Sequence, residues 1–147
     1  MIDGISTDTV KLLLIEDNDI DREIVRRAFR KADIPCEIVT ARDGGEAIDL
    51  MLGDADNEPL PRPYMVMLDL DMPEIDGLEF LSEIRADPIL RRTVIFVLTG
   101  AIRDDDRDRC YDHCVAGVLL KDRLNNDPVG LVSMLRDYWK LVDFPRE

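Results

Sequence analysis

The feature that most constrains the fold is a short apolar run, residues 64–68, that stops abruptly on the carboxylate of Asp69. A run this short and this apolar is typical of a strand buried on both faces, as in a parallel sheet covered by helices. In open α/β sheets, ligands bind outside the carboxyl ends of the strands, and Asp69 lies at such an end. Position alone therefore makes Asp69 a candidate site residue.

The rest of the chain repeats this pattern of a strand followed by a helix. Short apolar or alternating runs predict the strands, while apolar residues at helical spacing after an Asp cap predict the helices. The predicted strands are 11–15, 36–41, 64–68, 93–98 and 117–120, and the predicted helices are 20–32, a short one between Asp43 and Gly53, 77–86, 103–115 and 128–141, with Asp19, Asp43 and Asp76 as N-caps.

Five strands alternating with five helices predict an α/β fold with a doubly wound five-stranded parallel sheet of strand order 2-1-3-4-5. The strand at 36–41 mixes polar and apolar side chains, which suits the edge of such a sheet.

Length and composition limit the remaining choices. With 147 residues we expect one domain, 1–147 with a core of about 10–142, and no output domain. Lys and Arg total 19 against 32 Asp and Glu, and the net charge of −13 argues against nucleic-acid or membrane binding and favours cations. The chain shows no signal peptide and no apolar run of bilayer length, so we expect a cytoplasmic location.

Polar side chains follow four of the predicted strands: Glu16 and Asp17, Asp69, Thr99, and Lys121. Because parallel strands bring their carboxyl ends to one edge, these side chains are expected in one cleft. Carboxylates crowded together raise one another's pKa unless a cation is present. The sequence thus predicts a Mg²⁺ site with Asp17 and Asp69 as direct ligands and Glu16 in the outer shell.

Asp69 beside such a metal can act as a nucleophile toward phosphorus and form an aspartyl phosphate. Lys121 would supply positive charge to the phosphoryl oxygens, and Thr99 would donate a hydroxyl hydrogen bond to one of them. Phosphoryl transfer asks a protein mainly for positioning and charge neutralisation, which these residues can supply.

Together these residues resemble the receiver domain of two-component response regulators over about residues 10–139. The resemblance rests on their order and spacing, in Glu16-Asp17, residues 68–77, Leu98-Thr99 and Lys121. It implies a flavodoxin-like receiver fold. It also implies a phosphoprotein of phosphorelay signal transduction that takes part in its own phosphorylation but is not a turnover enzyme on external substrates.

The resemblance further implies a role for each site residue. Asp69 would accept phosphate from a sensor histidine kinase or phosphotransfer protein, and the backbone carbonyl of Asp71 would complete the metal site. Thr99 would move toward the phosphate on activation.

Three features concern partners. Residues 136–145 resemble the ending of small receivers that partner bacterial phytochromes, which suggests a bacteriophytochrome as partner. The helix 20–32 carries a basic face that is explained equally well by a solvated surface or by a kinase docking surface. The apolar ending is compatible with a homodimer through the last helix-strand-helix face; its residues are Trp139, Val142 and Phe144.

Two departures from the family pattern leave an alternative open. Asp122 stands where the family usually has a proline, often with a cis bond, so we expect a trans bond after Lys121. Val118 stands where the family often has an aromatic residue that reports phosphorylation. These departures motivate a degenerate receiver that acts as a phosphorylation-independent binding module.

A second alternative is a haloacid-dehalogenase-type phosphatase, because Asp69 and Asp71 resemble its nucleophile and acid pair. The order of motifs argues against it: that family opens on its Asp-x-Asp strand and places its extra metal acids after the lysine, whereas Glu16 and Asp17 come first.

Overall fold

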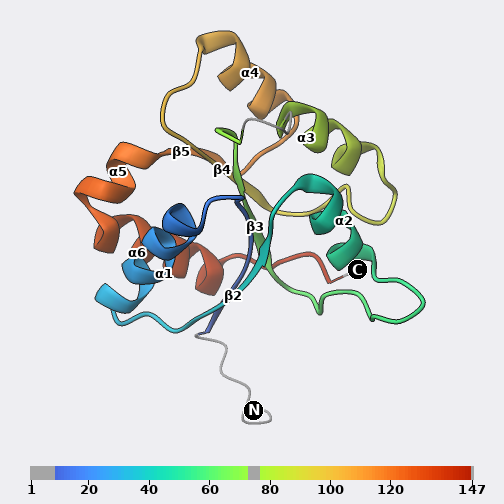
Figure 1. Cartoon of the computed structure of the whole chain (residues 1–147), viewed down its shortest axis with the longest axis horizontal. Coiled ribbons are helices and arrows are strands. Elements are labelled where there is room, and N and C mark those ends of the chain that lie inside the picture. The colour runs from blue at the N-terminus through green and yellow to red at the C-terminus, as the bar shows by residue number, and fades with distance from the viewer. Residues whose placement is uncertain (1–8, 73–76, 147) are drawn as a thin grey trace.

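The computed structural model describes residues 9–72 and 77–146, and these form a parallel sheet flanked by helices (Figure 1). The strand order is β2-β1-β3-β4-β5, with every neighbouring pair parallel. The strands are β1 (Val10–Ile15), β2 (Cys36–Ala41), β3 (Met65–Asp69), β4 (Ile95–Thr99) and β5 (Gly117–Leu120). The predicted fold class and strand order are confirmed.

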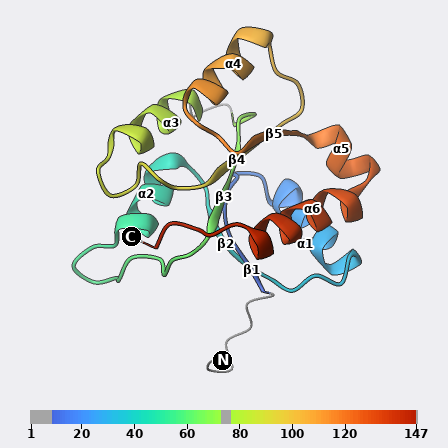
Figure 2. The ribbon, with the colours of Figure 1, turned by 180° about the vertical axis from the view of Figure 1, so that it is seen from behind.

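Helices cover both faces of the sheet, with α1, α5 and α6 on one side and α2, α3 and α4 on the other (Figures 1 and 2). Within the described parts of the chain, no helix is both long enough and apolar enough to cross a membrane. The helices are α1 (Asp19–Lys31), α2 (Gly44–Leu52), α3 (Gly77–Ala86), α4 (Asp104–Asp112), α5 (Lys121–Asn126) and α6 (Pro128–Leu141).

The central strand β3 is apolar up to its last residue, Asp69, because it faces a core on each side. Val66 and Leu68 pack in the cluster under α2, α3 and α4, whereas Met65 and Met67 pack in the cluster under α1, α5 and α6. Successive side chains of a strand point to opposite faces, which produces this division. The unbroken apolar run therefore follows from burial on both faces.

The prediction of five helices is wrong by one, because α5 begins directly after β5 at Lys121. A proline at 122 would disfavour a helical backbone at the residue before it, and Asp122 imposes no such restriction. The chain can therefore turn from strand to helix at Lys121. The described bond between Lys121 and Asp122 is trans, as expected.

Two predicted helix boundaries also need correction. The N-cap of α1 is Asn18 rather than Asp19, and its Oδ1 accepts hydrogen bonds from the amides of Ile20 and Asp21 at 2.8 and 3.1 Å. The helix predicted to reach residue 115 ends at Asp112, and Cys114 shortly after it has a left-handed φ of 58°. Asp43 caps α2 as predicted, and the predicted cap Asp76 lies outside the described residues.

The segment after α6 crosses the amino-terminal end of the sheet toward α2 (Figure 2). Phe144 is buried there, with its ring 5.8 Å from that of Tyr138 and 4.9 Å from that of Trp139. The apolar ending that suggested a dimer contact is thus largely used within the chain itself.

Candidate functional site

The predicted site residues meet at the carboxyl edge of the sheet. Glu16 directly follows β1, β3 ends on Asp69, β4 ends on Thr99, and Lys121 directly follows β5. Among the described residues, Glu16, Asp69 and Thr99 are three of only four buried polar or charged side chains; Thr93 is the fourth. Buried polar groups are costly unless they have partners, so this edge is built around polar contacts.

Asp69 is the most enclosed carboxylate at this edge, with a side chain only 2% exposed. Its Oδ2 lies 2.9 Å from Lys121 Nζ, and its Oδ1 accepts a 2.7 Å hydrogen bond from the amide of Asp71. A buried carboxylate held in this way has a fixed orientation and a cation beside it.

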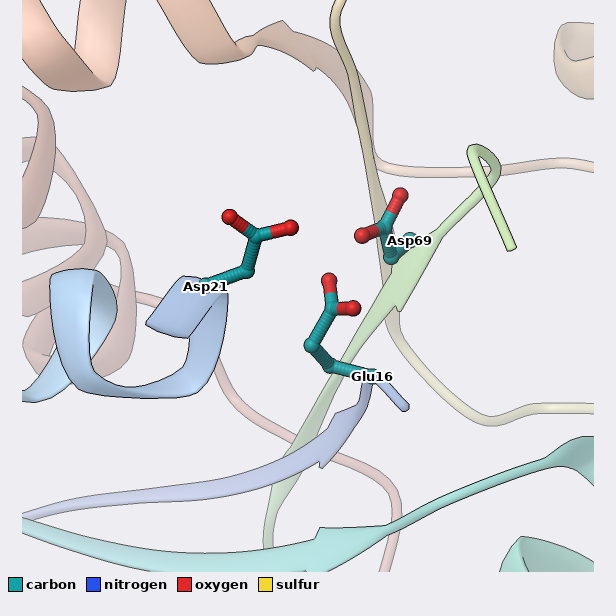
Figure 3. Close-up of side chains that lie close together, drawn as sticks. All are labelled: Glu16, Asp21 and Asp69. Carbon is teal, nitrogen blue, oxygen red and sulfur yellow. The ribbon is translucent and has the colours of Figure 1, made fainter. Parts of the chain in front are cut away.

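Three carboxylates could share a cation at this edge. Glu16, Asp21 and Asp69 each offer an oxygen, and these oxygens lie within 4.8 Å of one another. Figure 3 shows the three side chains directed toward a common space from the end of β1, the first turn of α1 and the end of β3. Carboxylate oxygens are the donors that hard divalent cations prefer, so this set fits such an ion.

This group differs from the predicted ligands, because Asp17 is exposed and is not in it. The cap at Asn18 starts α1 immediately, and its Oδ1 binds the amide of Asp21. Asp21 is thereby fixed in the first turn of α1 and reaches the sheet edge. Sequence reasoning assigned Asp21 only to a helix; the signal that could have found it is the short spacing from Glu16 to a capping Asn.

The opposite side of the site is closed by the side chain of Asp71. Its Oδ1 accepts a hydrogen bond from Thr99 Oγ1 at 2.9 Å, and its Oδ2 accepts one from the Gly100 amide at 2.7 Å. Lys121 Nζ lies 3.2 Å from the same Oδ2 and 3.6 Å from Asp21 Oδ2. For a receiver site, the resemblance implied a role only for the backbone carbonyl of Asp71, and that role toward a metal stays a prediction.

These contacts change two protonation equilibria. Burial alone would raise the pKa of Asp71, but hydrogen bonds from Gly100, Thr99 and Lys121 outweigh it and lower that pKa. Burial would likewise lower the pKa of Lys121, but its bonds to the carboxylates of Asp69 and Asp71 outweigh burial and raise that pKa. Asp71 and Lys121 are therefore charged at neutral pH.

Val118, the second departure from the family pattern, is half-buried in β5 against the core under α2, α3 and α4. Its amide donates a 3.2 Å hydrogen bond to the hydroxyl oxygen of Tyr111 on α4. This aromatic contact between α4 and β5 was not found from the sequence.

Comparison with known proteins assigns this arrangement to a family. Residues 12–133 match the response regulator receiver domain. The chain is 33% identical over 128 residues to response regulator Rcp1 of Synechocystis sp., a match that covers 87% of each chain. It is 37% identical over 129 residues to the probable methanogenesis regulatory protein FilR2 of Methanothrix harundinacea, covering 87% of this chain and 82% of FilR2.

Solved structures agree with the sequence matches. The phosphorylated cyanobacterial phytochrome response regulator RcpA superposes with a TM-score of 0.78 at 32% identity, covering 93% of this chain and 99% of RcpA. The Mn²⁺-bound form of Rcp1 superposes with a TM-score of 0.76 at 32% identity, covering 92% of this chain and 99% of Rcp1. By fold, by sequence and by the polar edge described above, this chain belongs to the response regulator receiver domain family.

Proposed function

We propose that Asp69 is the phosphoryl acceptor of this response regulator and that a sensor histidine kinase or phosphotransfer protein is the donor. The main support for the proposal is the environment of the Asp69 side chain. The side chain is 2% exposed at the end of β3, with Lys121 Nζ 2.9 Å from one oxygen and two further carboxylates facing it. A strand-end Asp with no function would not need a partly buried lysine and two further carboxylates around it.

The transfer needs little covalent chemistry from the protein. An Asp69 oxygen attacks the phosphorus of a phosphohistidine, the new O–P bond forms as the P–N bond breaks, and the leaving imidazole nitrogen takes up a proton. Lys121 and the Thr99 hydroxyl then bind oxygens of the transferred group, and fixed donors of this kind are the main source of catalysis in such sites.

We infer Mg²⁺ as the resident cation, held by Asp69 and by Glu16 and Asp21, which the geometry favours. Further candidate ligands are Asp17, which the sequence favours, and the backbone carbonyl of Asp71, which the resemblance to receiver domains implies. A bound Mg²⁺ would neutralise charge on the phosphoryl oxygens. The all-oxygen donor set supports this choice, as does the family membership shown by the comparisons.

For the donor, we infer a kinase of the bacteriophytochrome class. Support comes from RcpA, described as a phytochrome response regulator, and from the resemblance of residues 136–145 to the ending of such receivers. Since the match spans 87% of the length of Rcp1, we also infer that residues 1–147 act as one receiver domain whose output passes through protein contacts.

The two alternatives from the sequence are not favoured. The relatives of this chain are response regulators rather than haloacid-dehalogenase-type phosphatases. A degenerate receiver is not favoured either, because the charged side chains around Asp69 are all present and in mutual contact.

Intact mass after incubation with Mg²⁺ and phosphoramidate tests the proposal. We expect one added phosphoryl group on the wild type and none on Asp69→Asn, which keeps the shape of the side chain but removes the nucleophile. Beryllofluoride binding, followed by ¹⁹F NMR, checks that the site can accept a phosphoryl-like group. No adduct and no beryllofluoride binding in the wild type would contradict the proposal and support a binding module instead.

The choice of kinase needs its own test. A phosphorylated bacteriophytochrome kinase should transfer its label to this protein much faster than an unrelated histidine kinase does. Equal rates from both kinases would remove the phytochrome assignment while leaving Asp69 as the acceptor.

A further inference from the structure

The side chain of Asp71 occupies the donors that a phosphoryl group would need. It accepts from a hydroxyl, Thr99 Oγ1, from a backbone amide, Gly100 N, and from an ammonium, Lys121 Nζ, at 2.9, 2.7 and 3.2 Å. These donors come from two separate segments, the one after β4 and the one after β5. An anion is therefore already bound where the proposed function requires the phosphoryl oxygens to bind.

A carboxylate and a phosphoryl group both present oxygen acceptors to such donors, so each competes with the other for them. Asp71 is also adjacent to the reacting group, since its own amide donates to Asp69 Oδ1 at 2.7 Å. A phosphoryl group on Asp69 that reached Thr99 and Lys121 would have to displace the Asp71 carboxylate from both.

The surroundings of Asp71 permit its carboxylate to bind the donors described above and also to leave them. A Cβ on Gly100 would lie 3.2 Å from Asp71 Oδ2, so the absence of a side chain at that position permits the close approach. The Asp71 side chain is 39% exposed, and it lines a cavity of about 350 Å³ between the ends of β3 and β4 and the helices α3 and α4. The carboxylate can therefore turn toward solvent without disturbing the core.

We propose that the Asp71 carboxylate is an internal competitor of the phosphoryl group. It positions Thr99, Gly100 and Lys121 in the unphosphorylated protein, and it must leave these donors when Asp69 is phosphorylated. This inference rests on the proposed function of Asp69, and it gives the side chain of Asp71 a role separate from that of its backbone carbonyl. In the resting protein, this contact holds the segment after β4 in place.

The test compares Asp71→Asn and Asp71→Ala with the wild type, in the full chain with Mg²⁺. Both substitutions keep the backbone carbonyl, and both affect a side chain outside the core, so the fold is retained. We expect phosphorylation by phosphoramidate, followed by intact mass, to become about tenfold faster, and the affinity for beryllofluoride to rise by a similar factor, because the competing charge-assisted hydrogen bonds are lost. Asp71→Ala, which removes both acceptors, should show the larger gain.

Removal of any negative charge could also speed the approach of an anionic donor, so a matched control is needed. Asp106 lines the same cavity but pairs with Arg109 at 3.6 Å instead of with the donors that Asp71 occupies. Asp106→Asn should leave the rate within about twofold of the wild type, since the bonds from Thr99, Gly100 and Lys121 to Asp71 stay in place. An equal gain in Asp106→Asn would overturn the inference and leave only a general charge effect.

The Gly100 amide gives a readout that a general charge effect would not move. In the wild type its ¹⁵N–¹H signal should shift strongly on addition of beryllofluoride, because its acceptor changes from Asp71 to another group. In Asp71→Ala the signal should differ from that of the wild type before any addition. Unchanged rates in both Asp71 variants, in a wild type that is phosphorylated, would overturn this inference alone, whereas a wild type that takes up no phosphoryl group would overturn the proposed function on which it rests.

Discussion

The two sides of the site differ in how closely their polar groups are paired. On the α1 side, Glu16 and Asp21 offer carboxylate oxygens that face Asp69, and Asp21 Oδ2 lies 3.6 Å from Lys121 Nζ. On the β4 side, the donors Thr99 and Gly100 already have an acceptor in Asp71. The first side is thus arranged to receive a cation, and the second is closed by an anion of the protein.

Lys121 joins the two sides. Its Nζ lies within 4.0 Å of carboxylates from both, at 2.9 Å from Asp69, 3.2 Å from Asp71 and 3.6 Å from Asp21. One ammonium group therefore partly neutralises three carboxylates. The resting site is therefore short of positive charge on the α1 side, and its phosphoryl-binding donors on the β4 side already have an acceptor.

Loss of the Lys121 ammonium group, which contacts carboxylates on both sides, should have the largest effect on the rate of phosphorylation. Lys121→Met is expected to slow phosphorylation by phosphoramidate by about a hundredfold or more, as removal of a fixed charge-stabilising donor usually does. Intact mass over time measures the rate. Lys31→Met, which removes an exposed lysine at the end of α1, should leave that rate unchanged. Equal rates for the two variants would mean that Lys121 does not serve the phosphoryl group.

The same substitution, Lys121→Met, should also lower the stability of the fold. In metal-free buffer, Lys121→Met leaves Asp69 buried without its ion pair, and we expect the free energy of unfolding to fall by about 3 kcal/mol. Excess Mg²⁺ should recover part of that loss, because it supplies positive charge to the same carboxylates. A loss that Mg²⁺ does not reduce would indicate that the cation binds elsewhere.

Removal of a carboxylate on the α1 side should have the next largest effect, which is on the affinity for the metal ion. Asp21→Asn and Glu16→Gln should each weaken Mn²⁺ or Mg²⁺ binding by about tenfold, as loss of a ligand or its close neighbour commonly does. Titration calorimetry, or the electron paramagnetic resonance signal of free Mn²⁺, measures the affinity. Asp17→Asn should weaken metal binding less, since Asp17 is exposed and does not belong to the group of Glu16, Asp21 and Asp69. A greater loss in Asp17→Asn than in Asp21→Asn would restore the ligand choice made from the sequence.

Several elements of the fold, and the edge of the sheet that holds the site, could be predicted from the sequence. The strands β2 and β5 and the helices α3 and α6 have the predicted bounds, because apolar periodicity and Gly or Pro boundaries report directly on burial and backbone geometry. The edge that gathers Asp69, Thr99 and Lys121 was also predictable, because it follows from parallel strands alone.

Sequence reasoning did not place the side chains of Asp21 and Asp71 around Asp69, because their placement depends on side-chain direction. Asp21 reaches the site only because Asn18, rather than Asp19, caps α1, a difference of one residue in where the helix starts. Asp71 closes the other side only because the segment after β4 brings Thr99 and Gly100 to its carboxylate. The cap is a local feature that the spacing from Glu16 to Asn18 could have indicated, whereas the contacts of Asp71 depend on how separate segments meet in the fold.

On the closed side, Thr99→Val should have a moderate effect. The substitution keeps the shape of a buried side chain but removes the donor to Asp71, which should lower the free energy of unfolding by about 1 kcal/mol. Chemical denaturation measures the change. Thr99→Ser, which keeps the hydroxyl, is the control and should retain the hydrogen bond. If Thr99→Val were as stable as the wild type, the Thr99–Asp71 bond would contribute nothing to the closed arrangement.

The smallest effect is expected at the outer edge of the cation-binding side, where two arginines of α1 differ. Arg22 has a side chain only 13% exposed, and its guanidinium donates to the Glu16 carbonyl at 3.1 Å and pairs with Asp19. Arg26 lies on the next turn but lines a separate surface groove with Arg30. Of Arg22 and Arg26, it is therefore Arg26 that lies where it could act as part of a docking surface.

Charge reversal at these two positions separates site support from docking. Arg22→Glu should lower the free energy of unfolding by about 1 kcal/mol because the hydrogen bond to the Glu16 carbonyl is lost, whereas Arg26→Glu should change it by less than about 0.5 kcal/mol. Arg26→Glu should leave phosphorylation by phosphoramidate unchanged and slow transfer from a histidine kinase a few fold, since charges at the rim of an interface act mainly on association. Unchanged kinase transfer in Arg26→Glu would mean that Arg26 is not part of a docking surface, and it would favour the interpretation of the basic face of α1 as a solvated surface.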